Sequence, residues 1–247
     1  MIGVARAGLA LALLAGIVWS TGPAGAADPP LSRESVEQIV RDYLIRHPEV
    51  VGNALRALEQ QREVAERQRR AEALRTYQRD LTRDPAAPVA GNPDGDVTVV
   101  EFFDYRCGYC KTVAPTVQQL LREDSKVRVV YKELPILGPD SLLAARAALA
   151  ARTQGKYAAL HEALMAAKEP LTRPAILDIA RRAGLDAARL DKDMEAPEIL
   201  AHIRRNHELA EMIGVNGTPA FVIGTEVAPG ALDLPSFKRL VEQARRK

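Results

Sequence analysis

The sequence is poor in aromatic residues and in cysteine, and it has almost no net charge. Aromatic residues make up 4% of the 247 positions, so any core must be built mainly from Ala, Leu, Val and Ile. The 34 basic and 32 acidic residues give a net charge of +2, which excludes a nucleic-acid binder that works by bulk positive charge. With two cysteines, the chain cannot form a multi-disulfide scaffold or a metal site of three or four of its own cysteines.

Long apolar runs are also scarce, and the one at the N-terminus has the features of a secretory signal. Arg6 precedes an apolar run, Ala7–Trp19, that is shorter than the roughly 20 residues needed to span a bilayer. Residues 24–26 (AGA) offer the small-x-small pattern that signal peptidase accepts. We therefore expect a cleaved signal peptide at 1–26, with an uncleaved anchor as the alternative. Export matters here because a cysteine pair can be oxidised outside the cytosol.

Residues 27–84 form a candidate helical arm. The stretch 31–84 is rich in Arg, Glu, Gln, Ala and Leu, and its single glycine is Gly52. Apolar residues recur at helical spacing until His47-Pro48 interrupts the pattern, and Pro48 suits the first turn of a second helix. A seven-residue repeat then predicts a stalk through which copies of the chain pair; its members are Leu44, Val51, Leu58 and Ala65. The alternatives are an arm folded onto its own domain and an arm that binds another partner.

A Pro-, Gly- and Asn-rich stretch at 85–95 predicts a linker, after which the pattern changes to alternating strands and helices. We expect buried strands at 97–103, 127–131 and 220–223, with a short fourth at 226–228. Helical patterns cover 107–123, 141–212 and 234–246. The order predicts an α/β domain over 96–247, a small sheet flanked by helices with a helical insertion at about 139–212.

Both cysteines lie in one CxxC motif, Cys107-Gly108-Tyr109-Cys110. Two randomly placed cysteines would show this spacing only about once in a hundred times, so chance is a weak explanation. The motif falls at a strand-to-helix junction, where the helix N-terminus stabilises a thiolate. We expect Cys107 to be exposed to solvent, to have a lowered pKa and to exchange disulfides with a substrate. Cys110, one turn inside the helix, should be shielded and should resolve the mixed disulfide.

Two other uses of the cysteines are the alternatives to this interpretation. An inert structural disulfide across two residues closes a very small loop and adds little stability. Two thiolates could bind Cu(I), whereas zinc would need two further ligands. The histidines are more typical of surface or packing positions, because none lies near the motif in the sequence; they are His47, His161, His202 and His207. We therefore expect no metal and no cofactor other than a redox-active Cys107–Cys110 disulfide.

Two further positions stand out by their chemistry. Glu101 lies in an otherwise apolar strand, six residues before Cys107, where a carboxylate is costly unless it is paired or protonated. The alternative is a glutamate at an exposed strand end, paired with a neighbouring lysine. Pro219 follows Thr218 just before a predicted strand, and X-Pro bonds in such tight loops are sometimes cis, although trans is the ordinary form.

Three segments together resemble a known family. They are 101–111 (EFFDYRCGYCK), 110–115 (CKTVAP) and 214–221 (GVNGTPAF). The first resembles the active-site segment of the DsbA-like periplasmic thiol:disulfide oxidoreductases, the second a run of thioredoxin in which a proline kinks the helix, and the third the family's loop before a cis-proline. The resemblance implies a thioredoxin fold with an inserted helical domain, and it covers about residues 96–247.

The resemblance also implies roles for individual residues. Thr218 and a cis Pro219 would lie opposite Cys107 and bind an extended substrate, together with Gly108 and Tyr109. The matching acidic position in the family lies beneath the active site, which implies a proton-relay role for Glu101 toward the inner cysteine.

Within this family the closest resemblance is to the ScsC-type (copper-sensitivity-suppressor) subgroup with DsbC-like active-site features. Gly108-Tyr109 and the threonine before Pro219 resemble DsbC, and the N-terminal helices resemble ScsC, whereas DsbA typically has Pro-His between its cysteines and lacks the arm. The resemblance implies a periplasmic, homo-oligomeric disulfide isomerase or reductase. Its partners would be misfolded proteins with thiols or disulfides and a membrane reductant like DsbD or ScsB. The alternatives are a DsbA-type oxidase served by a DsbB-like partner, and a copper-binding thiol protein.

Overall fold

The computed structural model describes residues 32–246. The signal peptide predicted at 1–26 lies outside the described residues. The chain divides into two compact units, with the boundary between Leu58 and Glu59. Among the described helices, none is both long enough and apolar enough to cross a membrane.

Two helices open the described chain, and they meet where the sequence predicts a break. Helix α1 (Arg33–Arg46) begins after Ser32, whose hydroxyl accepts a hydrogen bond from the backbone N–H of Ser35, at 3.2 Å. It ends at His47, and α2 (Pro48–Thr76) starts with proline, which has no N–H to leave unpaired in a first helical turn. A short helix, α3 (Gln78–Thr82), follows.

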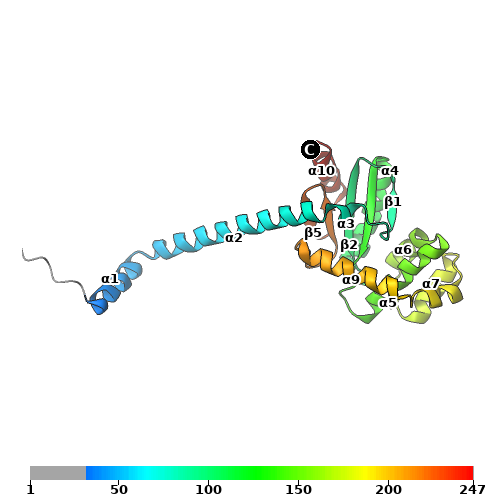
Figure 1. Ribbon diagram of the computed structural model, residues 1–247, viewed down its shortest axis with the longest axis horizontal. Coiled ribbons are helices and arrows are strands. Elements are labelled where there is room, and N and C mark those ends of the chain that lie inside the picture. The colour runs from blue at the N-terminus through cyan, green and yellow to red at the C-terminus, as the bar shows by residue number, and fades with distance from the viewer. Residues whose placement is uncertain (1–31, 247) are drawn as a thin grey trace, which may run out of the picture. The chain divides into compact units, whose positions relative to one another are not determined.

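Five strands form one mixed sheet in the order β1-β3-β2-β4-β5 (Figure 1). Strands β2 and β3 are parallel neighbours, and the other pairs are antiparallel. The two central strands are rich in valine and aromatic residues, which suit a sheet covered on both faces. The strands are β1 (Val89–Gly91), β2 (Val97–Phe103), β3 (Val127–Glu133), β4 (Ala220–Ile223) and β5 (Glu226–Pro229).

Part of the range predicted as a linker belongs to this sheet. Residues 85–95 include β1, which pairs antiparallel with β3 and sets Val89 opposite Val130. Ala87 and Pro88, just before the strand, are buried. The amino-acid sequence of this segment did not predict a strand. Three residues are too few to show a strand pattern, and their conformation depends on pairing with a strand that is distant in the sequence. The sheet therefore begins earlier in the chain than the sequence predicts.

Helices cover both faces of the sheet, and β2 divides its side chains between them. Val97, Val99 and Phe103 join a large apolar cluster with α4 (Gly108–Glu123), α10 (Leu234–Arg245) and helices of the insertion. Val100 and Phe102 point to the other face, into a smaller cluster completed by the end of α2, by α3 and by α9 (Pro197–Met212). This alternation is the period of two expected of a strand.

The predicted helical insertion lies between β3 and β4, beginning at Pro139 and ending at Met212. Its helices α5, α6 and α7 form a group beside the sheet (Figure 1). The elements are α5 (Pro139–Ala150), a 3-10 turn (Ala151–Gln154), α6 (Tyr157–Ala166), α7 (Arg173–Arg182), α8 (Ala187–Asp193) and α9. The fold is a thioredoxin-like fold with a helical insertion and N-terminal helices, as the sequence predicts.

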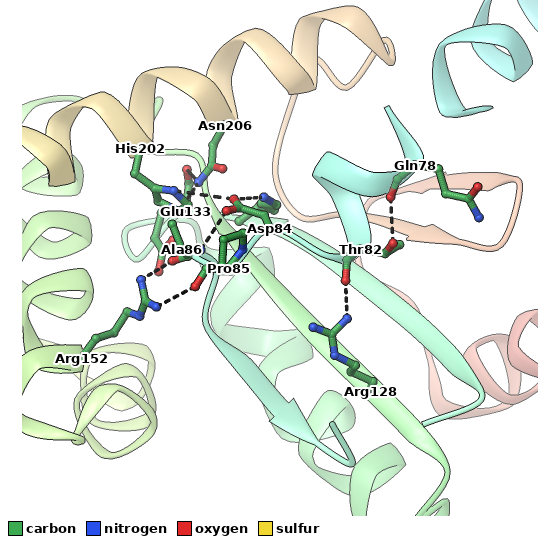
Figure 2. Close-up of polar contacts among 11 residues, drawn as sticks. Gln78, Thr82, Asp84, Pro85, Ala86, Arg128, Glu133, Arg152, His202 and Asn206 are labelled. Atoms are coloured by element: carbon green, nitrogen blue, oxygen red, sulfur yellow. Dashed lines mark hydrogen bonds and ion pairs between the residues drawn. The ribbon is translucent and has the colours of Figure 1, made fainter. Parts of the chain in front are cut away.

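Polar contacts fasten the segment that leads from α3 into the sheet (Figure 2). The ammonium group of Lys132, on β3, lies 2.7 Å from the carboxylate of Asp84. The Arg152 guanidinium donates to the carbonyl oxygens of Pro85 and Ala86. The Lys132 side chain is 1% exposed, so its charge depends on Asp84 for compensation.

Replacing Asp84 should therefore destabilise the protein far more than replacing an exposed carboxylate. Asp84→Asn leaves Lys132 buried without a countercharge, and we expect the free energy of unfolding to fall by about 3–5 kcal/mol. Asp178→Asn is the matched control, because Asp178 pairs with Arg181 on an exposed helix face and such pairs contribute at most about 1 kcal/mol. Urea denaturation of both variants measures the difference, and equal losses would contradict the buried-pair argument.

Candidate active site

Cys107 occupies the N-cap position of α4, at the strand-to-helix junction where the sequence places it. Its backbone is extended, with φ −72° and ψ 117°, and its carbonyl accepts the first helical hydrogen bond from the N–H of Lys111, at 3.1 Å. Its sulfur accepts a hydrogen bond from the backbone N–H of Cys110, with N and Sγ 3.4 Å apart. The Cys107 sulfur thus lies at the N-terminal end of the helix, in contact with a backbone donor of the first turn.

The loop before β4 lies directly against this sulfur, although it is 111 residues away in the sequence. The Cys107 thiol donates a hydrogen bond to the carbonyl oxygen of Thr218, at 3.2 Å. The Thr218–Pro219 peptide bond is cis, which confirms the prediction for this bond. The structure therefore brings the two sequence motifs together at one site.

The expected solvent exposure of Cys107 is wrong, because the residue is only 7% exposed. The Thr218 carbonyl oxygen is one of the atoms in contact with the sulfur. Cys110 is fully buried, as predicted, and burial raises the pKa of its thiol well above the ordinary value. Between them, Tyr109 is 72% exposed, so the dipeptide Gly108-Tyr109 lies at the surface.

Asp104 holds the turn that carries the motif, a role that sequence reasoning did not assign. Its buried carboxylate accepts hydrogen bonds from the backbone N–H groups of Arg106 (2.7 Å), Ile136 (2.9 Å) and Leu137 (3.0 Å) and from the hydroxyl of Ser141 (2.8 Å). The loop after β3 is thereby tied to the end of β2. An aspartate directly after a buried strand was the available signal, but three of its four partners lie more than 30 residues away.

Glu101 is buried in the middle of β2, opposite Tyr131 of β3 and Phe221 of β4. In the alternation of β2 it shares a face with Val99 and Phe103, whose cluster also contains Cys110. Among the described residues, its carboxyl group forms no ion pair, so the alternative of an exposed glutamate bonded to lysine does not hold. Burial raises the pKa of Glu101 to about 8.

A set of buried polar side chains lies around His161, in a part of the core where the sequence analysis predicted no functional site. The Tyr105 hydroxyl and His161 Nδ1 lie 3.0 Å apart, and the Tyr157 hydroxyl donates to the carboxylate of Glu133 at 2.7 Å. The rings of Tyr131 and Tyr157 pack against the imidazole. Burial lowers the pKa of His161 to about 3, so this histidine is neutral and packs in the core, as predicted.

No cluster of three or more His, Cys, Asp or Glu side chains within residues 32–246 is arranged to hold a metal ion. His202 lies in the interior near Asp84 (Figure 2), and burial lowers its pKa to about 4. Neither buried histidine is therefore grouped with the cysteine pair.

Comparison with known proteins identifies relatives of both parts of the chain. Residues 98–242 match the family described as DSBA-like thioredoxin domain, and residues 33–65 match the Copper resistance protein ScsC N-terminal domain. A thioredoxin-like oxidoreductase from Silicibacter pomeroyi is 51% identical, with a TM-score of 0.67, over 68% of this chain and 98% of that one. The catalytic domain of Proteus mirabilis ScsC is 31% identical, with a TM-score of 0.66, over 72% of this chain and 99% of that one.

The chain is also similar to part of some much longer proteins. It is 31% identical over 158 residues to a Na(+)/H(+) antiporter, NhaA 3, from Salinispora tropica. The match covers 63% of this chain and 24% of the antiporter, so the chain spans about a quarter of the length of this curated relative.

The raised pKa of Glu101 predicts a pH-dependent stability. In the window from the ordinary pKa of 4.5 to about 8, the folded carboxyl keeps its proton while the unfolded one loses it, so stability falls as pH rises. At about 1.4 kcal/mol per pKa unit, the loss amounts to a few kcal/mol.

Glu101→Gln should flatten this slope, measured as the free energy of unfolding at a series of pH values. Glu133, whose pKa burial raises to about 7, keeps part of the slope in the variant. Glu211→Gln, an exposed position on α9, is the control and should leave the slope unchanged. An unaltered slope in Glu101→Gln would show that this carboxyl is ionised in the folded protein.

Proposed function

The chain belongs to the DSBA-like thioredoxin-domain family, and we propose that it is an exported thiol:disulfide interchange enzyme that isomerises or reduces the disulfides of misfolded proteins. The observation that carries the proposal is the position of the Cys107 sulfur, capped by the N–H of Cys110 and 3.2 Å from the carbonyl before Pro219. This sulfur lies beside a backbone segment that can pair with an extended client chain.

In the first step the Cys107 thiolate attacks one sulfur of a client disulfide. A bond forms between Cys107 and that sulfur, the client S–S bond breaks, and the other client sulfur leaves as a thiolate. In isomerisation, the freed thiolate attacks a different client disulfide, and a client thiolate finally displaces Cys107. The client then has the same number of disulfides, and the enzyme returns to its dithiol form.

In reduction, Cys110 completes the cycle. Its thiolate attacks the Cys107 sulfur, the Cys107–Cys110 disulfide forms, and the remaining client sulfur leaves as a thiolate. The client gains two electrons and the enzyme loses two, so a reductant must restore the dithiol. We assign this task to a membrane reductant like DsbD or ScsB, and a DsbB-like oxidant would take its place if the enzyme worked as an oxidase.

The electrostatic difference between the two cysteines supports this division of roles. Cys107 accepts a backbone N–H at the helix N-terminus, whereas Cys110 is fully buried and its raised pKa opposes ionisation. Cys110 therefore needs a base when it resolves the mixed disulfide. Glu101 faces the same cluster, and a carboxyl with a pKa of about 8 exchanges its proton near neutral pH, so we assign the proton relay to Glu101.

The surface next to the sulfur suits an unfolded client. Tyr109, Ile136 and Leu137 are large apolar side chains that are 72%, 43% and 44% exposed. Asp104 fixes the loop that carries Ile136 and Leu137 to the turn before Cys107. Unfolded proteins present apolar segments, and exposed apolar groups of this kind serve as binding sites for them.

The N-terminal helices support a homo-oligomer. Helix α1 has no buried residue, and large apolar side chains are exposed along it and the start of α2: Val36, Ile39, Val40, Tyr43, Leu44, Ile45, Val50, Val51, Leu55 and Leu58. Apolar residues at helical spacing are buried when copies pair. Linked active sites would raise the concentration of attacking thiols around one client. The matching relatives support export to the periplasm, with the signal at 1–26 as its means.

Isomerase activity predicts recovery of ribonuclease activity from scrambled, fully oxidised ribonuclease. The reduced wild-type protein should restore the activity, and Cys107→Ser should reduce the rate to background because no attacking thiolate remains. Cys110→Ala should keep part of the isomerase activity, lose reductase activity toward insulin, and accumulate mixed disulfides with clients.

Recovery equal to that of Cys107→Ser would contradict the isomerase proposal. The direction of electron flow is read separately, by alkylating free thiols in growing cells. A reduced Cys107–Cys110 pair is expected for an isomerase or reductase, and a mainly oxidised pair would favour the oxidase.

Charged substitutions in the exposed apolar stripe should separate the subunits. Leu55→Glu and Leu58→Glu place carboxylates where the paired helices would bury leucine, so light scattering should show the mass of one chain instead of a multiple of it. Arg62→Glu, at an exposed polar position of the same helix, is the control and should keep the mass of wild type. A wild-type protein with the mass of one chain would contradict the oligomer.

A further inference from the structure

A hollow lies beside the loop that carries Thr218 and Pro219. It has a volume of about 360 Å³ and is lined by the loop itself, by the end of β5 and by one side chain of α2, Arg70. The Cys107 thiol contacts the Thr218 carbonyl, and Thr218 also lines this hollow, so the reacting sulfur and the hollow adjoin the same loop residue.

Packing of the end of α2 places Arg70 at the hollow. Leu74 and Tyr77, on the following turn, join the apolar cluster on this face of the sheet together with Val215 and Ala220. Helix and loop are thereby held against each other. Gly214, in the loop, has φ +73°. A Cβ at this position would lie 3.5 Å from Arg70 Nε, so the guanidinium lies next to the backbone of the loop.

Arg70 is exposed, and its charge is not paired within the described part of the chain. Of the described residues that line the hollow, Arg70 alone is charged. Among the residues of the structure that are described, its guanidinium has no hydrogen bond and no ion pair. Its neighbours on α2 differ, because Arg67 and Arg75 pair with Glu63 and Glu72.

We propose that Arg70 is a specificity-determining residue, which binds a carboxylate side chain of the client segment next to the reacting cysteine. The proposal rests on the proposed function and names the clients that it favours: segments with Glu or Asp near the cysteine. The guanidinium presents several N–H donors in one plane, which match the two oxygens of a carboxylate. The hollow provides room for such a side chain between Arg70 and the loop.

The test uses disulfide-linked dimers of a short peptide with one cysteine, in which the two sulfurs are equivalent. Glu, Gln or Lys is placed at each position from one to four residues on either side of the cysteine. The second-order rate constant of reduced full-length protein with each peptide is measured at low salt. We expect the best-placed Glu peptide to react about three- to tenfold faster than its Gln counterpart, the range for a partly exposed charged hydrogen bond.

Charge variants assign this preference to Arg70. Arg70→Gln should abolish the preference for Glu, and Arg70→Glu should reverse it in favour of Lys. Arg69→Glu makes the same change of charge one residue away, where the Arg69 side chain bonds to the carbonyl of Ala65 on its own helix, and it should keep the preference. A less stable helix would slow the reaction with all peptides alike, so it could not change the preference from Glu to Lys.

The outcomes separate the two proposals. Equal rates for Glu and Gln peptides, or an equal effect of Arg69→Glu and Arg70→Glu, would overturn the role of Arg70 and leave the proposed function in place. A wild-type protein that reacts with none of the peptides would overturn the proposed function and the role of Arg70 with it.

Discussion

The hydrogen bonds at the sulfur of Cys107 are the constraint around which the domain is arranged. A backbone N–H of α4 donates to this sulfur, and the carbonyl of Thr218 accepts from it. Strands β2 and β4 are antiparallel neighbours, with Phe102 opposite Ala220, so the end of the first and the start of the second lie together. The helical insertion fills the long stretch of chain between β3 and β4 without disturbing this pairing.

Three buried carboxyl groups near the central strands differ in the number of hydrogen bonds that they accept. Asp104 accepts four hydrogen bonds and fixes two loops. Glu133 accepts one from Tyr157, and its other oxygen has no hydrogen-bond partner among residues 32–246. Glu101 has only apolar burial to set its pKa. A fold tolerates buried groups of the last kind at a cost in stability, and strongly shifted pKa values of this kind are common at functional sites.

Much of the site could be predicted because its signals are local. The CxxC spacing, the apolar run that ends before it and the Thr-Pro pair before a strand are all visible within a few residues. The features that were missed depend on partners far along the chain. Strand β1 exists because β3 pairs with it, Asp104 bonds to residues past 130, and the Thr218 carbonyl contacts the Cys107 sulfur. Reading one segment at a time cannot supply such contacts.

The sheet order has a consequence for the tendency of the domain to aggregate. Its two outer strands, β1 and β5, are three and four residues long, and β5 ends in Pro229, which has no N–H to offer. Short edges with proline give an aggregating polypeptide little to add onto as an extra strand. The sheet that carries the cysteine motif is thus poorly suited to template cross-β growth.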